Sequence, residues 1–162
     1  MMNAYEYAMK LEKDGENFYR ELAAAANEEG LRKIFTMLAN EEVKHYKLFE
    51  KLANDSDAIT LPKMEVYTDA KKIFEDMQKI SVAYDIGDQQ IDFYRRAVES
   101  EDKAYELYLE KADEVSDPKH KEIFLRIAQE ELKHKDLLEN ILEFVERPTE
   151  WLESAEFYKI GD

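Results

Sequence analysis

The sequence predicts an all-α fold, an antiparallel four-helix bundle with a long crossover between the second and third helices. Apolar residues recur at alternating steps of three and four through four long segments, which is the period of an amphipathic helix. The 162 residues include only four Gly and three Pro, too few turn formers for a fold of many short strands. The second half of the chain also repeats the first. We expect a single domain over residues 1–162.

The first helical hairpin is predicted over residues 4–53. Its first helix carries an apolar seam from Tyr5 to Ala26, and Gly30 is a residue that favours the end of a helix. A second seam begins at Leu31 and continues to Leu52. Because the connection is short, the two helices should pack antiparallel.

The crossover is predicted over residues 54–88. Polar residues at 54–57 and Pro62 indicate a loop, and the apolar spacing from Ala70 to Ile80 indicates a short amphipathic helix. Asp88 is a candidate N-cap for the helix that follows. A connection of this length can cross the bundle from one end to the other.

The second hairpin is predicted over residues 89–147, followed by a C-terminal tail at 148–162. Pro118 suits the first turn of the fourth helix, and Pro148 is expected to end it. Because the tail contains Trp151 and other aromatic residues, we expect it to dock on the bundle.

The two hairpins are copies of one another. A shift of 89 residues superposes the first half on the second without a gap, and chemically important residues coincide. The shift carries Glu12 onto Glu101, Tyr19 onto Tyr108, Glu42 onto Glu131 and His45 onto His134.

Ionisable residues interrupt all four apolar seams. Single glutamates stand in the first and third, and a Glu-x-x-His pair stands in each of the other two. A spacing of three places the Glu and the His on one helical face. The candidate metal ligands are Glu12, Glu42, His45, Glu101, Glu131 and His134.

Burial of these six side chains requires a neutralising partner. Four carboxylates at one depth would repel each other, whereas two bound cations relieve that repulsion. One Glu from each of two helices with Glu-x-x-His from each of the others is the ligand pattern of di-iron carboxylate bundles. We therefore predict two iron ions as cofactor, with manganese or a mixed metal pair remaining open.

Neighbouring residues offer weaker alternatives. Glu16 competes with Glu12, but its position in the repeat is occupied by Tyr105 in the second half. Glu99 and Asp102 are expected in solvent, and His120 on the surface. Tyr19 and Tyr108 repeat together with the ligands, so we expect their hydroxyl groups to bond to metal-binding carboxylates. Packing in the core is the simpler alternative for both tyrosines.

Charge and composition exclude other classes of protein. A formal net charge of −15 opposes nonspecific binding of nucleic acid and of anionic membranes. The absence of cysteine excludes disulfides, iron–sulfur clusters and a rubredoxin-type iron site in this sequence. No apolar stretch is long enough for a transmembrane helix, and the N-terminus does not resemble a signal peptide. We expect a cytoplasmic protein.

The six-residue motif resembles the rubrerythrin and bacterioferritin branch of the ferritin-like superfamily, over about residues 4–146. The resemblance implies a ferritin-like bundle in which the Glu of each Glu-x-x-His bridges two metals. It assigns Glu42 and Glu131 as bridges, Glu12 with His45 to one iron, and Glu101 with His134 to the other. Rubrerythrins carry a further Glu where this sequence has Ala104, and they usually carry a rubredoxin-like domain, which needs cysteine.

The expected function is that of a di-iron redox protein of the ferroxidase or peroxidase type. It would oxidise Fe(II), or reduce O₂ or peroxide with electrons from a donor that the sequence does not identify. Iron storage in a ferritin-like assembly and hydroxylation of an organic substrate are the alternatives. Whether the chain forms a homo-oligomer is left open.

Overall fold

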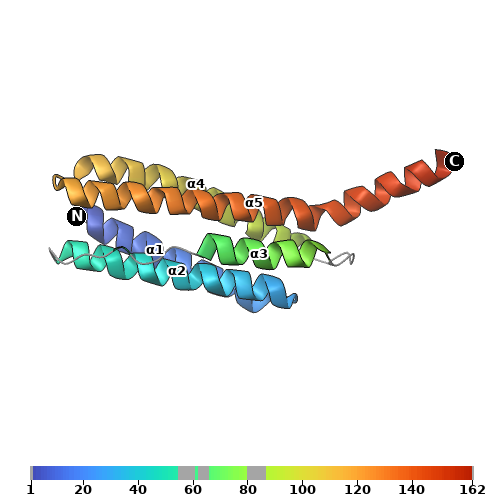
Figure 1. Cartoon of the computed structure of the whole chain (residues 1–162), viewed down its shortest axis with the longest axis horizontal. Coiled ribbons are helices and arrows are strands. Elements are labelled where there is room, and N and C mark those ends of the chain that lie inside the picture. Colours follow the sequence, from blue (N-terminus) through green and yellow to red (C-terminus); the bar gives the residue numbers. More distant parts are fainter. Residues whose placement is uncertain (1, 55–60, 62–65, 80–86, 162) are drawn as a thin grey trace.

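The computed structural model describes residues 2–54, 61, 66–79 and 87–161, with side chains as far as Glu146. The described residues contain five helices and no strand. An all-helical, four-helix bundle is therefore confirmed, with one further helix in the crossover (Figure 1). The helices are α1 (Ala4–Ala25), α2 (Glu29–Ala53), α3 (Val66–Lys79), α4 (Asp88–Glu114) and α5 (Pro118–Gly161).

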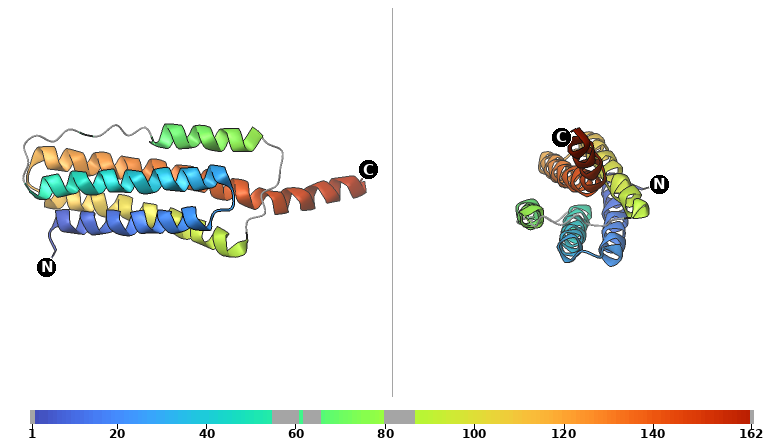
Figure 2. Two further views of the ribbon diagram at one scale, coloured as in Figure 1. Left: turned by 90° about the horizontal axis from the view of Figure 1, so that it is seen from below. Right: turned by 90° about the vertical axis from the view of Figure 1, so that its right-hand side faces the viewer.

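The bundle consists of two antiparallel pairs. Helix α1 packs mainly on α2, and α4 packs mainly on α5. Helices α1 and α4 also run in opposite directions where the two pairs meet (Figure 2). Asn3 caps the start of α1, because its side-chain oxygen accepts a hydrogen bond from the backbone N–H of Glu6 at 2.8 Å.

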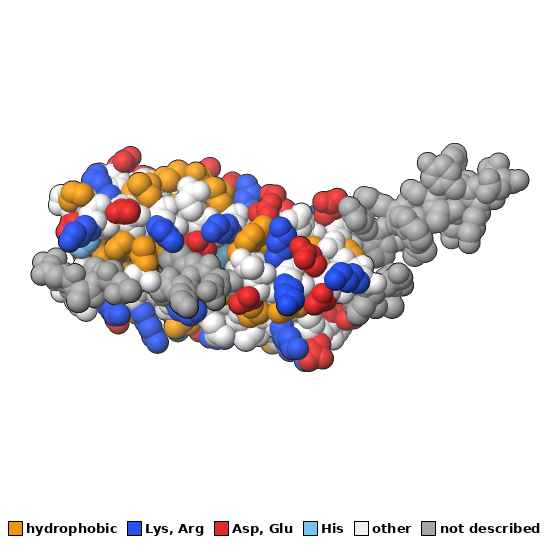
Figure 3. Space-filling model, viewed as in Figure 1, with side chains coloured by type: hydrophobic (Ala, Val, Ile, Leu, Met, Phe, Trp, Pro, Cys, Tyr) orange, Lys and Arg blue, Asp and Glu red, His pale blue; other side chains and the backbone are white. Residues whose placement is uncertain are grey.

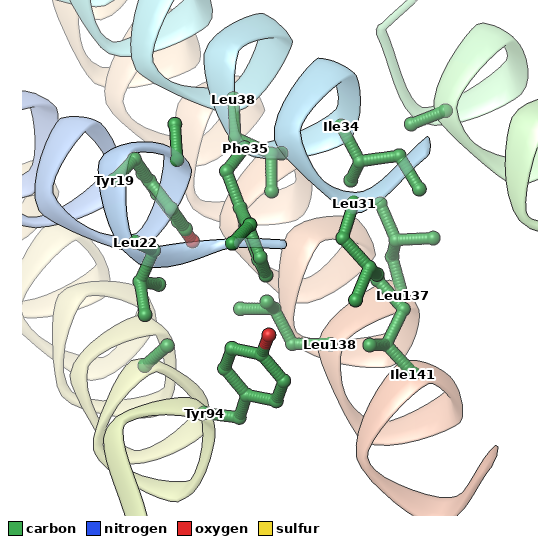
Figure 4. Close-up of a cluster of buried hydrophobic side chains, with 14 of the residues drawn as sticks. Tyr19, Leu22, Leu31, Ile34, Phe35, Leu38, Tyr94, Leu137, Leu138 and Ile141 are labelled. Atoms are coloured by element: carbon green, nitrogen blue, oxygen red, sulfur yellow. The ribbon is translucent and has the colours of Figure 1, made fainter. Parts of the chain in front are cut away.

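The apolar core is divided into two clusters. One includes Leu31, Phe35 and Leu138, and the other includes Phe49 and Phe124. Figure 4 shows the first cluster, in which side chains from all four bundle helices point toward one another. The carboxylate and imidazole side chains described below lie between the two clusters in sequence on each helix. A polar layer is therefore held in place by apolar packing on both sides.

Helix α3 lies against α2 and α5 and closes one side of the bundle. Its buried side chains are Ala70, Phe74 and Met77, which agrees with the predicted amphipathic helix. Gly30 does not end α1, as the sequence suggested, but lies in the first turn of α2. A Cβ atom at Gly30 would stand 2.5 Å from Met77 Sδ, so the glycine allows α3 to approach α2 closely.

The start of α4 differs by one residue from the prediction. The N-cap of α4 is Gly87, and Asp88 is the first helical residue. An aspartate suits the first turn as well as the cap, because it interacts favourably with the helix dipole in both places. The polar loop predicted at 55–57, Pro62 and Ile80 lie outside the described residues.

Helix α5 does not end at Pro148 but continues to Gly161. A proline within a helix removes one backbone hydrogen bond, and it can bend the helix without ending it. The last turns bend and extend past the ends of the other helices (Figures 1 and 2). The side chains of this segment lie outside the described residues, so its expected docking on the bundle stays a prediction.

The surface carries charges of both signs. Lysine and arginine side chains alternate with aspartate and glutamate over the face shown in Figure 3. Among the described residues, no helix has an apolar stretch of the length needed to span a bilayer.

The Tyr94 hydroxyl provides a test of the core. The side chain is 1% exposed and packs on Phe35 with ring centroids 5.3 Å apart, and the structure gives its hydroxyl no hydrogen-bond partner. Burial raises the pKa of Tyr94 to about 12. Because an unpaired buried hydroxyl is destabilising, Tyr94→Phe should raise the free energy of unfolding by about 1 kcal/mol.

Thermal or urea unfolding of the Tyr94→Phe variant measures this effect. Tyr108→Phe is the matched control, because the Tyr108 hydroxyl donates to Glu12 Oε1 at 2.6 Å. Loss of that bond should destabilise the protein. Equal destabilisation by both substitutions would show that the Tyr94 hydroxyl has a partner in solution.

Candidate metal centre

The six predicted ligands converge in the middle of the bundle. Helices α1 and α4 each contribute one glutamate, and α2 and α5 each contribute a Glu-x-x-His pair. Each of the six side chains is buried, with at most 4% of its surface exposed. They form two groups that could each hold a metal ion, with the ligand atoms of each group within 4.8 Å of one another. The groups are Glu12, Glu42, His45 and Glu131, and Glu42, Glu101, Glu131 and His134.

Two glutamates belong to both groups. They are Glu42 and Glu131, and the rings of the two histidines are stacked with centroids 6.1 Å apart. His45 Nδ1 lies 3.4 Å from Glu12 Oε2 and 3.2 Å from Glu131 Oε1. His134 Nδ1 lies 3.6 Å from both Glu42 Oε1 and Glu101 Oε1. Both Nδ1 atoms therefore face the carboxylates, in the orientation that metal ligands require.

Every one of the six side chains has a buried polar atom without a hydrogen-bond partner in the structure. Unpaired polar atoms are rare in protein interiors and call for an explanation. A pair of cations supplies one, because carboxylate oxygens and neutral imidazole nitrogens are metal ligands. These residues therefore fit a dinuclear metal site. The atoms include Glu12 Oε2, Glu42 Oε1, His45 Nδ1, Glu101 Oε2, Glu131 Oε1 and His134 Nδ1.

Without metal, the carboxylates would share protons. Burial raises the pKa of Glu42 well above its ordinary value, and repulsion from Glu12 raises it further. Burial, followed by the charge of Glu131, raises the pKa of Glu101 to about 8. In contrast, the pKa of Glu131 is lowered, because hydrogen bonds from its neighbours outweigh burial and the charge of Glu42.

The pKa values of both imidazoles are also raised, which favours their protonated forms. Burial alone would lower the pKa of His45, but the negative charge of Glu12 and other carboxylate contacts raise it well above its ordinary value. The pKa of His134 is raised in the same way, chiefly by Glu101 against the effect of burial. Bound cations would replace these protons, because a metal requires ionised carboxylates and neutral imidazoles.

The two predicted tyrosines form reciprocal hydrogen bonds across the bundle. Tyr108 on α4 donates to Glu12 Oε1 on α1 at 2.6 Å, and Tyr19 on α1 donates to Glu101 Oε1 on α4. Burial raises the pKa of each tyrosine well above 10, so both hydroxyl groups remain donors at neutral pH. The expected bonds to the carboxylates are present, and they fix the positions of Glu12 and Glu101.

Two buried glutamates were not predicted. Glu41 and Glu130 precede the Glu-x-x-His pairs and are 1% and 4% exposed. Glu41 Oε1 lies 3.6 Å from His45 Nε2, on the side of the ring away from the cluster. Burial opposes ionisation, but His45 and nearby positive charges lower the pKa of Glu41. The repeat could have identified the pair, because 41 and 130 differ by the same 89 residues.

The duplicated glutamates have different neighbours. Glu130 Oε1 lies 3.2 Å from Lys133 Nζ, whereas the nearest oxygen of Glu41 lies 3.9 Å from Lys44 Nζ. Glu41 therefore contacts a candidate ligand, and Glu130 contacts a half-exposed lysine.

The alternative ligands lie outside the cluster. Glu16 pairs with Arg20 at 2.7 Å, and Asp102 pairs with Lys135 at 3.0 Å. His120 was expected on the surface, but it is only 7% exposed. Its Nδ1 lies 2.6 Å from the hydroxyl of Tyr5, a contact between residues 115 positions apart that the sequence pattern does not reveal.

A pocket of about 520 Å³ leads from the surface to the cluster between α1 and α4. Glu42, Glu101 and Glu131 form its inner end, and Gly15 borders it on α1. A Cβ atom at Gly15 would stand 2.8 Å from Glu42 Oε2, so glycine leaves room for this carboxylate. The cluster is therefore buried and accessible at the same time.

Comparison with known proteins agrees with this geometry. The family model described as Rubrerythrin matches residues 3–142, and it matches a second time over residues 92–158. The second match falls on the second hairpin, as the internal repeat would suggest. Comparisons with curated proteins and with solved structures give no match.

The metal-free protein should lose stability as the pH rises from about 5.5 to 8. A raised carboxyl pKa means that the folded state keeps a proton that the unfolded state releases above pH 4.5, and Glu101 keeps it up to about 8. The raised pKa values of His45 and His134 act in the same direction above pH 6.5. The lowered pKa of Glu131 does not contribute to the change, because this carboxyl is ionised in both the folded and the unfolded state above pH 5.5.

Thermal unfolding of the metal-free chain across this range measures the effect, and a decrease of several degrees is expected. Loading with Mn(II) should remove most of the dependence, because the ions displace the same protons. Glu101→Gln should flatten the metal-free profile. A stability that stays constant or increases with pH would contradict the proton-sharing cluster.

Glu41→Gln should weaken metal binding more than the matched substitution Glu130→Gln. Loss of a carboxylate that orients a ligating histidine typically lowers metal affinity by about 10- to 100-fold. The effect should fall on one of two ions, because only Glu41 lies against a candidate ligand in this way. Two-site titration calorimetry with Mn(II) measures it, and equal effects of both substitutions would contradict the asymmetry.

Proposed function

Because the chain belongs to the rubrerythrin family, we propose that it is a di-iron redox protein that reduces peroxide or O₂, or oxidises Fe(II). The observation that carries the proposal is the convergence of six buried ionisable side chains in two overlapping groups. The family itself suggests peroxide or O₂ as substrate.

The proposed ligand arrangement follows from the membership of the two groups. Glu42 and Glu131 belong to both, so they would bridge the ions. Glu12 with His45 would complete one site, and Glu101 with His134 the other. Six nitrogen and oxygen ligands without sulfur suit iron, and they also suit manganese.

A pair of ferrous ions, when bound, supplies the two electrons that reduction of an O–O bond requires. The protein residues hold the ligands in place and control access. Tyr19 and Tyr108 keep Glu101 and Glu12 oriented through their hydrogen bonds. The two apolar clusters exclude water from both sides of the layer. A separate electron donor would return the centre to its reduced state.

Anaerobic loading with Fe(II) followed by hydrogen peroxide or O₂ tests the proposal. We expect two iron ions per chain and the near-ultraviolet absorption of a ferric pair after oxidation. Glu42→Gln and Glu131→Gln should each slow this oxidation by about a hundredfold or more, since even the loss of an outer partner of a ligand costs 10- to 100-fold.

Glu16→Gln is the matched control for these variants. Glu16 lies one turn from Glu12, but its carboxylate forms surface ion pairs with Lys13 and Arg20. This variant should bind iron and react as the unmodified chain does. Oxidation that is unaffected by loss of Glu42 or Glu131 would show that the chemistry takes place elsewhere.

A further inference from the structure

The pocket between α1 and α4 is much larger than the substrates considered so far. Its volume is about 520 Å³, whereas a water molecule, similar in size to O₂ or hydrogen peroxide, occupies about 30 Å³. Pockets that bind small organic molecules usually measure about 300 to 1,000 Å³. The pocket thus has room for a molecule that carries a sizeable organic group.

The walls of the pocket are apolar, and its inner end is not. Leu11 and Phe18 on α1 face Leu107 on α4, while the carboxylates of Glu42 and Glu131 form the inner end. A ligand that fits this surface has a hydrocarbon part near the opening and a polar group at the cluster.

Small residues on both helices create the space. Gly15 lies three residues after Glu12, and Ala104 lies three residues after Glu101, at equivalent positions of the repeat. Both border the pocket. A larger side chain at either position would extend into the pocket. Gly15 also contacts the Glu42 carboxylate closely, so Ala104 is the position that can be enlarged.

The charges around the opening balance. The exposed lining residues Asp14 and Glu99 are matched by Arg96 and Lys103, although the chain as a whole carries a formal charge of −15. This balance favours an uncharged ligand over a cation or an anion.

We propose that the pocket binds an uncharged organic hydroperoxide, ROOH, with its hydrocarbon group against Leu11, Phe18 and Leu107. This inference rests on the proposed function, and it names the substrate class of the same centre. The O–O bond breaks, one oxygen leaves as the alcohol ROH and the other as water. The reaction consumes two protons and two electrons, and a pair of ferrous ions is the reductant.

Binding of cumyl alcohol to the Mn(II)-loaded chain tests the pocket without any turnover. This alcohol is the product of cumene hydroperoxide reduction. Ala104→Leu should weaken its binding about tenfold, because the new side chain occupies the space that the ligand needs. Ala24→Leu makes the same change at an exposed position of α1 outside the pocket, and it should leave binding unchanged.

The rate of a single oxidation of the ferrous protein provides the second measurement. Ala104→Leu should lower, about tenfold, the ratio of the second-order rate constant for oxidation by cumene hydroperoxide to the rate constant for oxidation by hydrogen peroxide. Thermal unfolding reports whether the variant folds. If it does not, Leu107→Ala removes one wall of the pocket instead and should also weaken binding of the alcohol.

The outcomes separate this inference from the function on which it rests. If hydrogen peroxide oxidises the ferrous protein but cumene hydroperoxide does not, and the alcohol fails to bind, the substrate class is wrong and the proposed function stands. If neither peroxide reacts although the alcohol binds in a way that depends on Ala104, the proposed function fails and the pocket is supported as a site for an organic molecule.

Discussion

The structure depends on the burial of six ionisable side chains in one layer of a helical bundle. Four carboxylates at this depth repel each other, because burial leaves their charges poorly screened. Without metal, the conflict is reduced by protons, as the raised pKa values of Glu42 and Glu101 indicate. Bound cations would resolve it better, because they would satisfy the unpaired oxygen and nitrogen atoms directly. The apolar clusters on either side supply the packing energy that holds this unfavourable layer together.

Duplication of one hairpin gives the centre an approximate symmetry. The reciprocal bonds of Tyr19 to Glu101 and of Tyr108 to Glu12 are its clearest expression, since each copy fixes a carboxylate of the other. The symmetry is broken close to the ligands. Glu41 lies against His45, whereas the equivalent Glu130 lies against Lys133. Two ions held in this frame would therefore have different surroundings.

Burial protects the layer from solvent, yet chemistry at its centre needs an entrance. The opening between α1 and α4 provides one where the two hairpins meet, because Gly15 and Ala104 occupy little space there. Among the described residues, close packing within each pair and α3, which lies against α2 and α5, cover other faces of the bundle. The same small residues thus determine which molecules can reach the carboxylates. The metal-binding side chains would determine which reaction those molecules undergo.

The sequence alone determined the class of fold, the helical segments of the bundle, the repeat and the six residues that converge. These follow from spacing along the chain, because a helix turns side chains three or four positions apart onto one face. Only the tertiary structure decided which other groups are buried with them. Glu41 and Glu130 lie one position off the apolar seam, and His120 is buried by Tyr5 from the opposite end of the chain. The continuation of α5 through Pro148 and the shape of the pocket likewise depend on the backbone path and on packing between helices, which no spacing within one helix specifies.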